Sequence, residues 1–273
     1  MRTTSNPAFR NLPGGQNGGY ATFDRQAGMM GGTAAYTDRA GVGYGRADAA
    51  ARPITVDDIV TKTAITAGAA IVAGGLTVWS GLYALALPAF IVGFVVSLVI
   101  IFKQSSNPAL VMTYSIAEGI ALGGISGLIN QAYPGIAFQA LIGTVGVFIG
   151  MLVVYKTGAV RVTPRFVKIV FASTLGVFGL MIVNAIAGIF TSGGLGLRDP
   201  QTNMGLAVIF SLVCIVIAAA NLIIDFDMIE QSVRRGTDEK FGWYLSWGIL
   251  ITLVWLYLEI LRLLSYLNGG RNN

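Results

Sequence analysis

The stretch NLIIDFDMIE, residues 221–230, places three carboxylates at the end of an apolar run. From Gly205 to Ile224 the chain has no charged residue, and a helix of that length crosses a bilayer core of roughly 30 Å. Asp225 then lies about one turn inside the helix end, whereas Asp227 and Glu230 belong to the membrane surface. An ionisable group within a membrane helix costs about 3 kcal/mol or more unless it is paired or hydrated. The stretch therefore predicts a transmembrane helix with a functional acid; the alternative is a helix-end carboxylate that reaches headgroup water.

Small and polar side chains share one face of this helix with Asp225. At about 100° per residue, they fall within roughly a quarter of the helix circumference. The face consists of Ser211, Cys214, Ala218, Asn221 and Asp225. Such a face should contact protein or water instead of lipid, which makes Asn221 a candidate pathway residue beside Asp225.

Composition assigns the whole chain to the membrane. Its 273 residues are 54% hydrophobic and 11% charged, whereas soluble domains carry about 25% charged residues. The net charge of +5 comes from basic residues next to apolar spans, which indicates topology signals and no nucleic-acid binding. With no His and one Cys, the chain lacks the means for disulfides, His or Cys metal sites and His-dependent catalysis. We expect no cofactor beyond transient calcium.

The chain divides into a polar tail and an apolar domain. Residues 1–52 are rich in Gly, Asn, Arg and Ala without an apolar period, so we expect a disordered cytoplasmic tail. Thr55, with Asp58 three residues later, predicts the capped start of a first helix. Residues 53–270 are predicted to form an all-α integral membrane domain, a bundle of seven transmembrane helices. The predicted spans are 60–81, 84–102, 108–129, 136–155, 166–190, 205–226 and 243–267.

Basic residues determine the expected orientation. They follow the second span, surround the connection between the fourth and fifth, and lie between the sixth and seventh. They are Lys103, then Lys156, Arg161, Arg165 and Lys168, then Arg234, Arg235 and Lys240. The loops on the other side hold only Arg198, which Asp199 balances. By the positive-inside rule the N-terminus is cytoplasmic and the C-terminus lies outside.

The third span carries a second intramembrane acid. Glu118 lies about ten residues, or about 15 Å, from the cytoplasmic end of this span, where a carboxylate needs a partner or a proton. Next to it, Gly119, Gly123 and Gly127 form a ridge of small residues typical of close helix packing. Glu118 is therefore a candidate pathway residue, whereas the glycines predict helix contacts.

The seventh span carries an acid and a base on one face. By the same angular count, the face consists of Gly248, Thr252, Trp255, Glu259, Arg262 and Tyr266. It should line the bundle interior opposite the sixth span. Glu259 and Arg262 are three residues apart, so a structural salt bridge and a pathway role are both open. Lys103 lies at about the depth of Asp225, and we expect these two charges to be in contact.

Three motifs in this order resemble the Bax inhibitor-1, or TMBIM, superfamily in its bacterial YccA-like branch. They are EGIALG in the third span, LIIDFDMIE in the sixth and the closing WLYLEILRLLSYL. The resemblance covers about residues 55–270 and excludes the tail. It implies a bacterial inner-membrane protein with one central helix ringed by six others, and a pH-sensitive calcium leak.

The resemblance also implies roles for particular residues. In characterised relatives, two acids on the last two helices share a proton and respond to a base at the cytoplasmic end of the second helix. Asp225 matches the sixth-helix acid, and Lys103 lies where the base would fall. Thr252 stands at the position of the seventh-helix acid, and Glu259 lies seven residues, or about 10 Å, further outward. We therefore expect a weaker or shifted pH response.

These observations predict a leak for calcium or another cation with a gate at Asp225. Burial and a nearby Lys103 would act on the protonation of Asp225 in opposite senses, and their contact would bias a two-state gate. Because calcium prefers oxygen ligands, Asp225 and Glu118 are candidates for weak, transient metal contacts.

Two other functions are alternatives to a leak. The first is a regulatory partner of a membrane-bound quality-control protease, which the tail would contact. The second is an enzyme, which is disfavoured because the GxGD context of an intramembrane aspartyl protease is missing. The seventh span also lacks any Asp for a catalytic pair and any Lys for a retinal protein.

Overall fold

The computed structural model describes residues 52–190 and 194–269, and this part of the chain is helical. Seven of its helices are long and apolar enough to cross a membrane. They are α1 (Val56–Ser80), α2 (Ala86–Lys103), α3 (Pro108–Ala132), α4 (Ile136–Lys156), α5 (Pro164–Phe190), α6 (Pro200–Arg234) and α7 (Phe241–Gly269), with a short 3-10 helix, η2 (Tyr83–Leu85), before α2. The predicted all-α, seven-span class is confirmed. Apart from Arg52, the predicted tail lies outside the described residues.

Local signals explain how the first helix begins and ends. Asp58 N–H donates to Thr55 Oγ1 at 3.3 Å, and Thr55 N–H donates to Asp58 Oδ2 at 2.9 Å. This reciprocal pair is the predicted capping box, which satisfies backbone donors at the helix start. Gly81 ends α1 with a φ of 69°, a conformation that glycine adopts without the penalty of a Cβ. The chain therefore turns directly into η2 and α2.

Helix α6 is longer than the apolar run that predicted it. It has 35 residues and begins after Asp199, whose carboxylate accepts from Gln201 N–H. Asn203 has extended backbone angles, so the first turn is separated from the rest of the helix by a kink. At the other end the helix continues to Arg234. Asp227 and Glu230 therefore lie on the same helix as Asp225.

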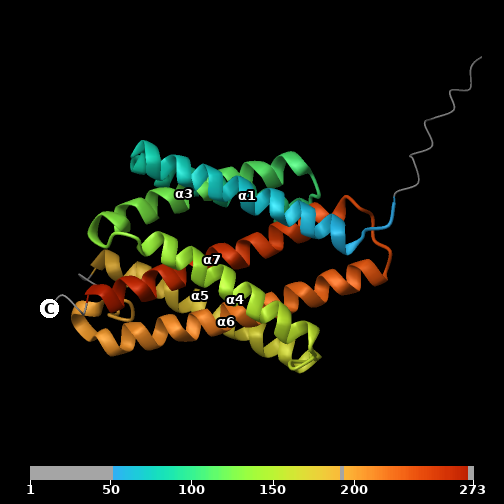
Figure 1. The fold of residues 1–273 in the computed structure, drawn as a ribbon. Coiled ribbons are helices and arrows are strands. Elements are labelled where there is room, and N and C mark those ends of the chain that lie inside the picture. Colours follow the sequence, from blue (N-terminus) through green and yellow to red (C-terminus); the bar gives the residue numbers. More distant parts are fainter. Residues whose placement is uncertain (1–51, 191–193, 270–273) are drawn as a thin grey trace, which may run out of the picture. The chain divides into compact units, whose positions relative to one another are not determined.

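Helix α7 occupies the centre of the bundle. It contacts α1, α3, α4 and α6, and Figure 1 shows it between the α1–α3 pair and the lower helices α4, α5 and α6. Helix α2 packs mainly on α3, and α5 packs mainly on α6. A central seventh helix agrees with the arrangement that the resemblance implies.

The glycine ridge of α3 forms the contact with α1. A Cβ built on Gly119 would collide with the backbone of Ala70, and one built on Gly123 would collide with the backbone of Gly74. Only hydrogen fits at these two positions, so the two backbones meet directly, as small-residue ridges allow in membranes. Gly127 instead meets the ring of Tyr83.

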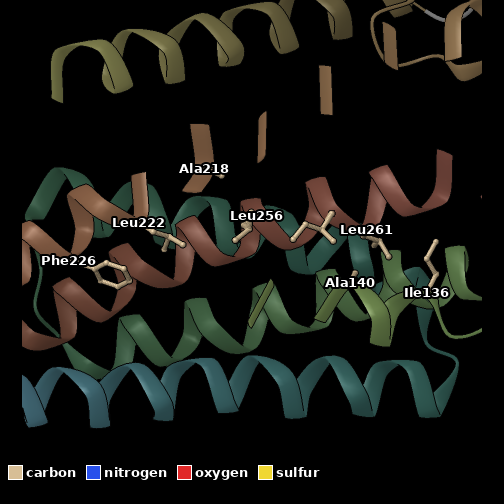
Figure 2. Packing of buried hydrophobic residues seen from close by; sticks show 8 residues of the cluster. Ile136, Ala140, Ala218, Leu222, Phe226, Leu256 and Leu261 are labelled. Carbon is tan, nitrogen blue, oxygen red and sulfur yellow. The ribbon is translucent and has the colours of Figure 1, made fainter. Parts of the chain in front are cut away.

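The largest described apolar cluster lies where α4, α6 and α7 meet. Its buried members are Ile136, Ala140, Ala218, Leu222, Phe226, Leu256, Ile260 and Leu261. Figure 2 shows their side chains as one continuous cluster along α7. Because it occupies the α6–α7 interface, this cluster sets the surroundings of the polar residues on these two helices.

Candidate functional site

Asp225 and Thr252 join α6 to α7. Thr252 Oγ1 donates to Asp225 Oδ2 at 2.7 Å, and the same hydroxyl lies 3.3 Å from the carbonyl oxygen of Gly248. Thr252 is buried and Asp225 is partly buried. A hydroxyl has one hydrogen to donate and can also accept. Thr252 can therefore donate to an ionised Asp225, or accept from a protonated Asp225 while it donates to Gly248.

The small, polar face of α6 is buried as predicted. Ser211, Cys214 and Ala218 are each fully buried, so this face contacts protein and not lipid. Ser211 Oγ is a buried atom that has no hydrogen-bond partner in the described part of the chain. The face thus places a polar group deep in the bundle, in line with Asp225.

Asn221 belongs to the same face but turns toward α5. Its Nδ2 donates to Thr174 Oγ1 and to the carbonyl oxygen of Ile217, both at 2.9 Å. Helix α5 packs mainly on α6, so this amide is a polar link in a largely apolar contact. The described contacts of Asn221 do not include Asp225, and its predicted pathway role stays a prediction.

Glu259 forms a buried ion cluster with two arginines. Its Oε1 accepts from Arg198 Nη2 at 2.7 Å and from Arg262 Nη1 at 2.9 Å. The Glu259 side chain is 2% exposed, whereas Arg198 and Arg262 are 18% and 31% exposed. Of the two roles open for Glu259 and Arg262, the salt bridge is present, and the pathway role stays a prediction.

Arg198 is the member of this cluster that sequence reasoning missed. It lies 61 residues before Glu259 and was assigned to a loop, balanced by Asp199. Its backbone carbonyl accepts from Tyr266 Oη at 2.8 Å, and its guanidinium lies 5.3 Å from the ring centre of Phe210. One feature of the sequence could have identified Arg198: it is the one basic residue in the loops opposite the predicted cytoplasmic side.

An apolar layer separates the two polar groups on α7. Thr252 and Glu259 are seven residues apart, about 10 Å along the helix, and Leu256 lies between them. Leu256 is fully buried in one cluster with Ala218 and Leu222 of α6, and Figure 2 shows the three near one another. The α6–α7 interface is therefore closed between Asp225 and Glu259 in this conformation.

Glu118 lies against α2, apart from the contacts of Asp225. A Cβ built on Gly93 of α2 would lie 3.2 Å from Glu118 Oε1, and Tyr114 interacts with the carboxyl from one turn earlier. Glu118 is buried. The ion pairs among the described residues do not include it. The structure thus gives Glu118 a polar neighbour and no link to the α6–α7 interface.

Comparison with known protein families identifies the relatives of this chain. A family model described as Bax inhibitor 1 like matches residues 6–269. The chain belongs to this family. A search of curated proteins found no match. The match starts before residue 55, so the Bax inhibitor 1 like family relationship extends into the tail that the motif-based resemblance excluded.

Family membership settles the broad class of the protein. The Bax inhibitor 1 like family consists of non-enzymatic membrane proteins, which confirms the expectation that the chain is not an enzyme. Seven candidate spans make it a multi-pass membrane protein.

The contact between Lys103 and Asp225, expected from their similar depth along the helices, is wrong for this conformation. Lys103 is exposed at the end of α2, and none of the ion pairs in the described ranges includes it. Helix α2 packs mainly on α3, whereas Asp225 contacts Thr252 on α7. Depth along the helices suggested the pair, but depth does not determine which neighbour a side chain faces.

A different lysine of this Bax inhibitor 1 like protein is held inside the bundle. Lys62 of α1 is buried, and its Nζ donates to the carbonyl oxygen of Glu239 at 2.8 Å and lies 3.5 Å from Glu239 Oε1. Gly242 makes room for it, because a Cβ there would lie 3.2 Å from Lys62 Nζ. Sequence reasoning missed Lys62, although a lysine within an apolar span is itself a signal of function.

Arg52 completes this second charge cluster. Its Nε donates to Glu239 Oε2 at 3.2 Å, and its Nη2 donates to Asp58 Oδ1 at 2.6 Å. The Arg52 guanidinium holds the pKa of the Glu239 carboxyl below its usual range, and hydrogen bonding to Glu239 and Asp58 raises the pKa of Arg52. Ile54 N–H also donates to Thr237 O at 2.8 Å. The start of α1 is therefore tied to the α6–α7 connection.

The predicted metal contacts are not brought together. Asp225 contacts α7 and Glu118 lies against α2. The described residues contain no group of three or more acidic, His or Cys side chains that could hold a metal ion. In this conformation Asp225 and Thr252 together offer one carboxylate and one hydroxyl to a passing cation.

Proposed function

We propose that this protein is a cation leak channel whose pathway runs between α6 and α7 and is gated at Asp225. The observation that carries the proposal is the Thr252–Asp225 hydrogen bond of 2.7 Å across that interface. It places an ionisable group in a polar row within the membrane, an arrangement that is expensive unless it serves a function. Calcium is the proposed cargo, as in the relatives that the motifs resemble.

The barrier that Asp225 would control is the apolar layer beyond it. Ala218, Leu222 and Leu256 exclude water between Asp225 and Glu259, so an ion passes only if α6 and α7 separate there. The Thr252–Asp225 hydrogen bond links the two helices next to this layer. A change in that bond would thus alter the balance between closed and open arrangements.

Protonation changes the direction of this hydrogen bond. An ionised Asp225 accepts from Thr252, while a protonated Asp225 donates to Thr252 and releases the threonine hydrogen toward Gly248 O. The pair remains bonded in both states, in contrast to two carboxylates, which repel each other when both are ionised. We therefore propose a pH response that is weaker than that of an acid pair.

The pathway would bind calcium only weakly at this point. Calcium takes about six to eight oxygen ligands in proteins, and Asp225 with Thr252 supplies only a carboxylate and a hydroxyl. The remaining ligands would be water. Weak binding suits a permeating ion, because the ion has to leave the site as readily as it enters.

Calcium flux into liposomes tests the proposal. Purified wild type and Asp225→Asn would be compared at pH values from about 5 to 8. We expect pH-dependent flux in the wild type and flux without that dependence in Asp225→Asn. Thr252→Asp, which places a second acid within hydrogen-bond reach of Asp225, should make the pH dependence steeper. The same pH profile in wild type and Asp225→Asn would remove Asp225 as the sensor.

The absence of flux from folded protein would favour the alternative function. In that case we would propose that the protein regulates a membrane-bound quality-control protease, the function that its resemblance to the YccA-like branch suggests. Co-purification with such a protease that is lost on deletion of residues 1–51 would support this assignment. Flux above that of empty liposomes would argue against it.

A further inference from the structure

A long groove runs along α1 and α4, with α7 contributing to its lining. Its volume is about 1530 Å³, larger than the roughly 300–1,000 Å³ of pockets for drug-sized ligands. On α1 its lining extends from Val56 to Trp79, nearly the whole helix. Because α1 is a membrane-spanning helix, the groove lies within the bilayer and extends across most of it.

The inside of the groove is apolar. Residues of α1, α4 and α7 such as Ile71, Ile149 and Leu253 line it. Its hydroxyl groups at Ser126 and Tyr257 are hydrogen-bonded to each other at 2.7 Å, so this pair is already satisfied. Hydrocarbon chains therefore suit the middle of the groove, because neither the chains nor this hydroxyl pair loses a hydrogen bond when they come into contact.

One end of the groove carries positive charge. Lys156 at the end of α4 and Arg161 in the following loop line this end, and both are exposed. In residues 52–190 and 194–269, the ion pairs include neither of them. Two cations beside a hydrocarbon-lined groove match an anionic headgroup, because basic pockets between membrane helices attract such lipids.

The two acids that line this end of the groove each have a hydrogen-bond partner. Glu230 accepts from Tyr155 Oη and from Arg234 Nη2, and Asp227 Oδ2 accepts from Gln231 Nε2 at 2.6 Å. The charge of Glu230 is thus paired with Arg234, whereas Asp227 keeps its charge beside a neutral amide. The lining charges at this end are three positive (Lys156, Arg161 and Arg234) and two negative (Asp227 and Glu230), so one positive charge remains for an external anion.

We propose that this groove binds an anionic phospholipid, whose acyl chains lie between α1 and α4 and whose phosphate contacts Lys156 and Arg161. The lipid would be a bound component, distinct from the mobile lipids around the other helices. Arginine matches phosphate through paired hydrogen bonds, and lysine adds a point charge. The groove is also lined by Phe226 of α6 and Leu253 of α7, next to the proposed ion pathway. Lipid binding and ion flux are measured separately, so either proposal can fail without the other.

Native mass spectrometry measures this binding directly. Purified protein in detergent would be titrated with phosphatidylglycerol and, separately, with phosphatidylcholine of the same acyl chains. We expect phosphatidylglycerol to bind about tenfold or more tightly, since each basic residue near an anionic lipid contributes about 1 kcal/mol. Glycerol phosphate without acyl chains should not bind, because the groove supplies the apolar part of the affinity.

Charge variants test the headgroup contact. Lys156→Ala with Arg161→Ala should reduce phosphatidylglycerol binding to the level of phosphatidylcholine. Arg165→Ala with Lys168→Ala is the matched control, because it removes the same charge from residues that do not line the groove. We expect this control to keep the wild-type preference.

A second pair of variants tests the acyl chains. Gly75 lines the groove, and a Cβ built there meets nothing within 4 Å, so Gly75→Leu adds a side chain to the groove at a position where its Cβ has open space. Gly68 lies on the same helix, also has open space at its Cβ, and does not line the groove. Gly75→Leu should weaken binding of both lipids, and Gly68→Leu should leave both unchanged.

Several results would overturn the proposal. Equal binding of the two lipids to the wild type, or an unchanged preference in the Lys156 and Arg161 variant, would exclude the headgroup contact. Unchanged binding in Gly75→Leu would exclude the groove. A dimer that carries no lipid and dissociates in Gly75→Leu would show that a second copy of the chain occupies the groove instead.

Discussion

The Glu259 carboxylate pairs with Arg198 and Arg262 where α7 contacts the connection between α5 and α6. Both of its arginine contacts use Oε1, while Oε2 and Arg198 Nε are buried and have no hydrogen-bond partner within the described ranges. A buried ion pair contributes little net stability, but removal of one partner leaves an uncompensated charge. The intact cluster thus holds the Arg198 loop to α7 while adding little net stability, whereas loss of its acid would be costly.

Glu259→Ala should lower stability strongly. It leaves Arg198 and Arg262 facing each other without an acid, and breaking a buried pair in this way costs about 3–5 kcal/mol. Thermal unfolding of the purified protein in detergent measures the effect. Arg234→Ala is the control, because its pair with Glu230 is largely exposed and such pairs contribute about 1 kcal/mol or less. Equal losses in the two variants would contradict the structural role assigned to Glu259.

The packing of α1 against α3 depends on two glycines. Gly119 and Gly123 place the α3 backbone directly on Ala70 and Gly74 of α1. Such close approach replaces the hydrophobic driving force that is missing between helices in lipid. Gly119 and Gly123 also line the α1–α4 groove.

Gly123→Ala should separate α1 from α3. The added methyl group would collide with the backbone of Gly74, which cannot move away as a flexible side chain does, so we expect a loss of about 1–3 kcal/mol. Gly68→Ala makes the same chemical change on α1 where the Cβ has open space. Unfolding of the two variants in one detergent provides the measurement. A Gly123→Ala protein as stable as Gly68→Ala would show that the ridge tolerates a side chain.

Sequence patterns predicted what depends on near neighbours in the chain. The Thr55 capping box, the glycine ridge and the Glu259–Arg262 pair all involve residues no more than a few positions apart, and the structure contains each of them. Apolar runs likewise predicted the seven spans, because crossing a bilayer depends on length and composition.

Contacts between distant residues were beyond those patterns. Lys62 and Glu239 are 177 residues apart, and Arg198 and Glu259 are 61 apart; no periodicity links such pairs. The same limitation produced the wrong Lys103–Asp225 contact. Helical spacing gives the face and depth of a side chain, but the partner depends on the order of helices around α7.

Charge clusters hold the central helix α7 near both of its ends. Glu239, just before α7, contacts Lys62 and Arg52, and Glu259, near the other end, contacts Arg198. Between them lie the Thr252–Asp225 bond and the apolar layer. If the clusters persist on opening, movement is confined to the middle of the α6–α7 interface.

The Glu239 cluster should make global stability depend on pH. Because the pKa of Glu239 is lowered in the folded protein, chiefly by the hydrogen bond from Arg52, the ionised carboxylate stabilises the fold at neutral pH. This contribution begins to fall near the unfolded value of about 4.3 and is lost as the pH drops through the lower folded value. Glu239→Gln should therefore lower the melting temperature at pH 7 and have a progressively smaller effect below about pH 4.

Thermal unfolding of wild type and Glu239→Gln across that pH range measures this dependence. Asp57→Asn is the matched control, because it removes one negative charge from an exposed residue near the same end of α1 that joins no ion pair among the described residues. Its effect should be small at every pH. A Glu239→Gln effect that stayed constant down to about pH 3 would mean that the carboxylate charge does not hold α1 to α7, and that the backbone contact from Lys62 to the Glu239 carbonyl suffices.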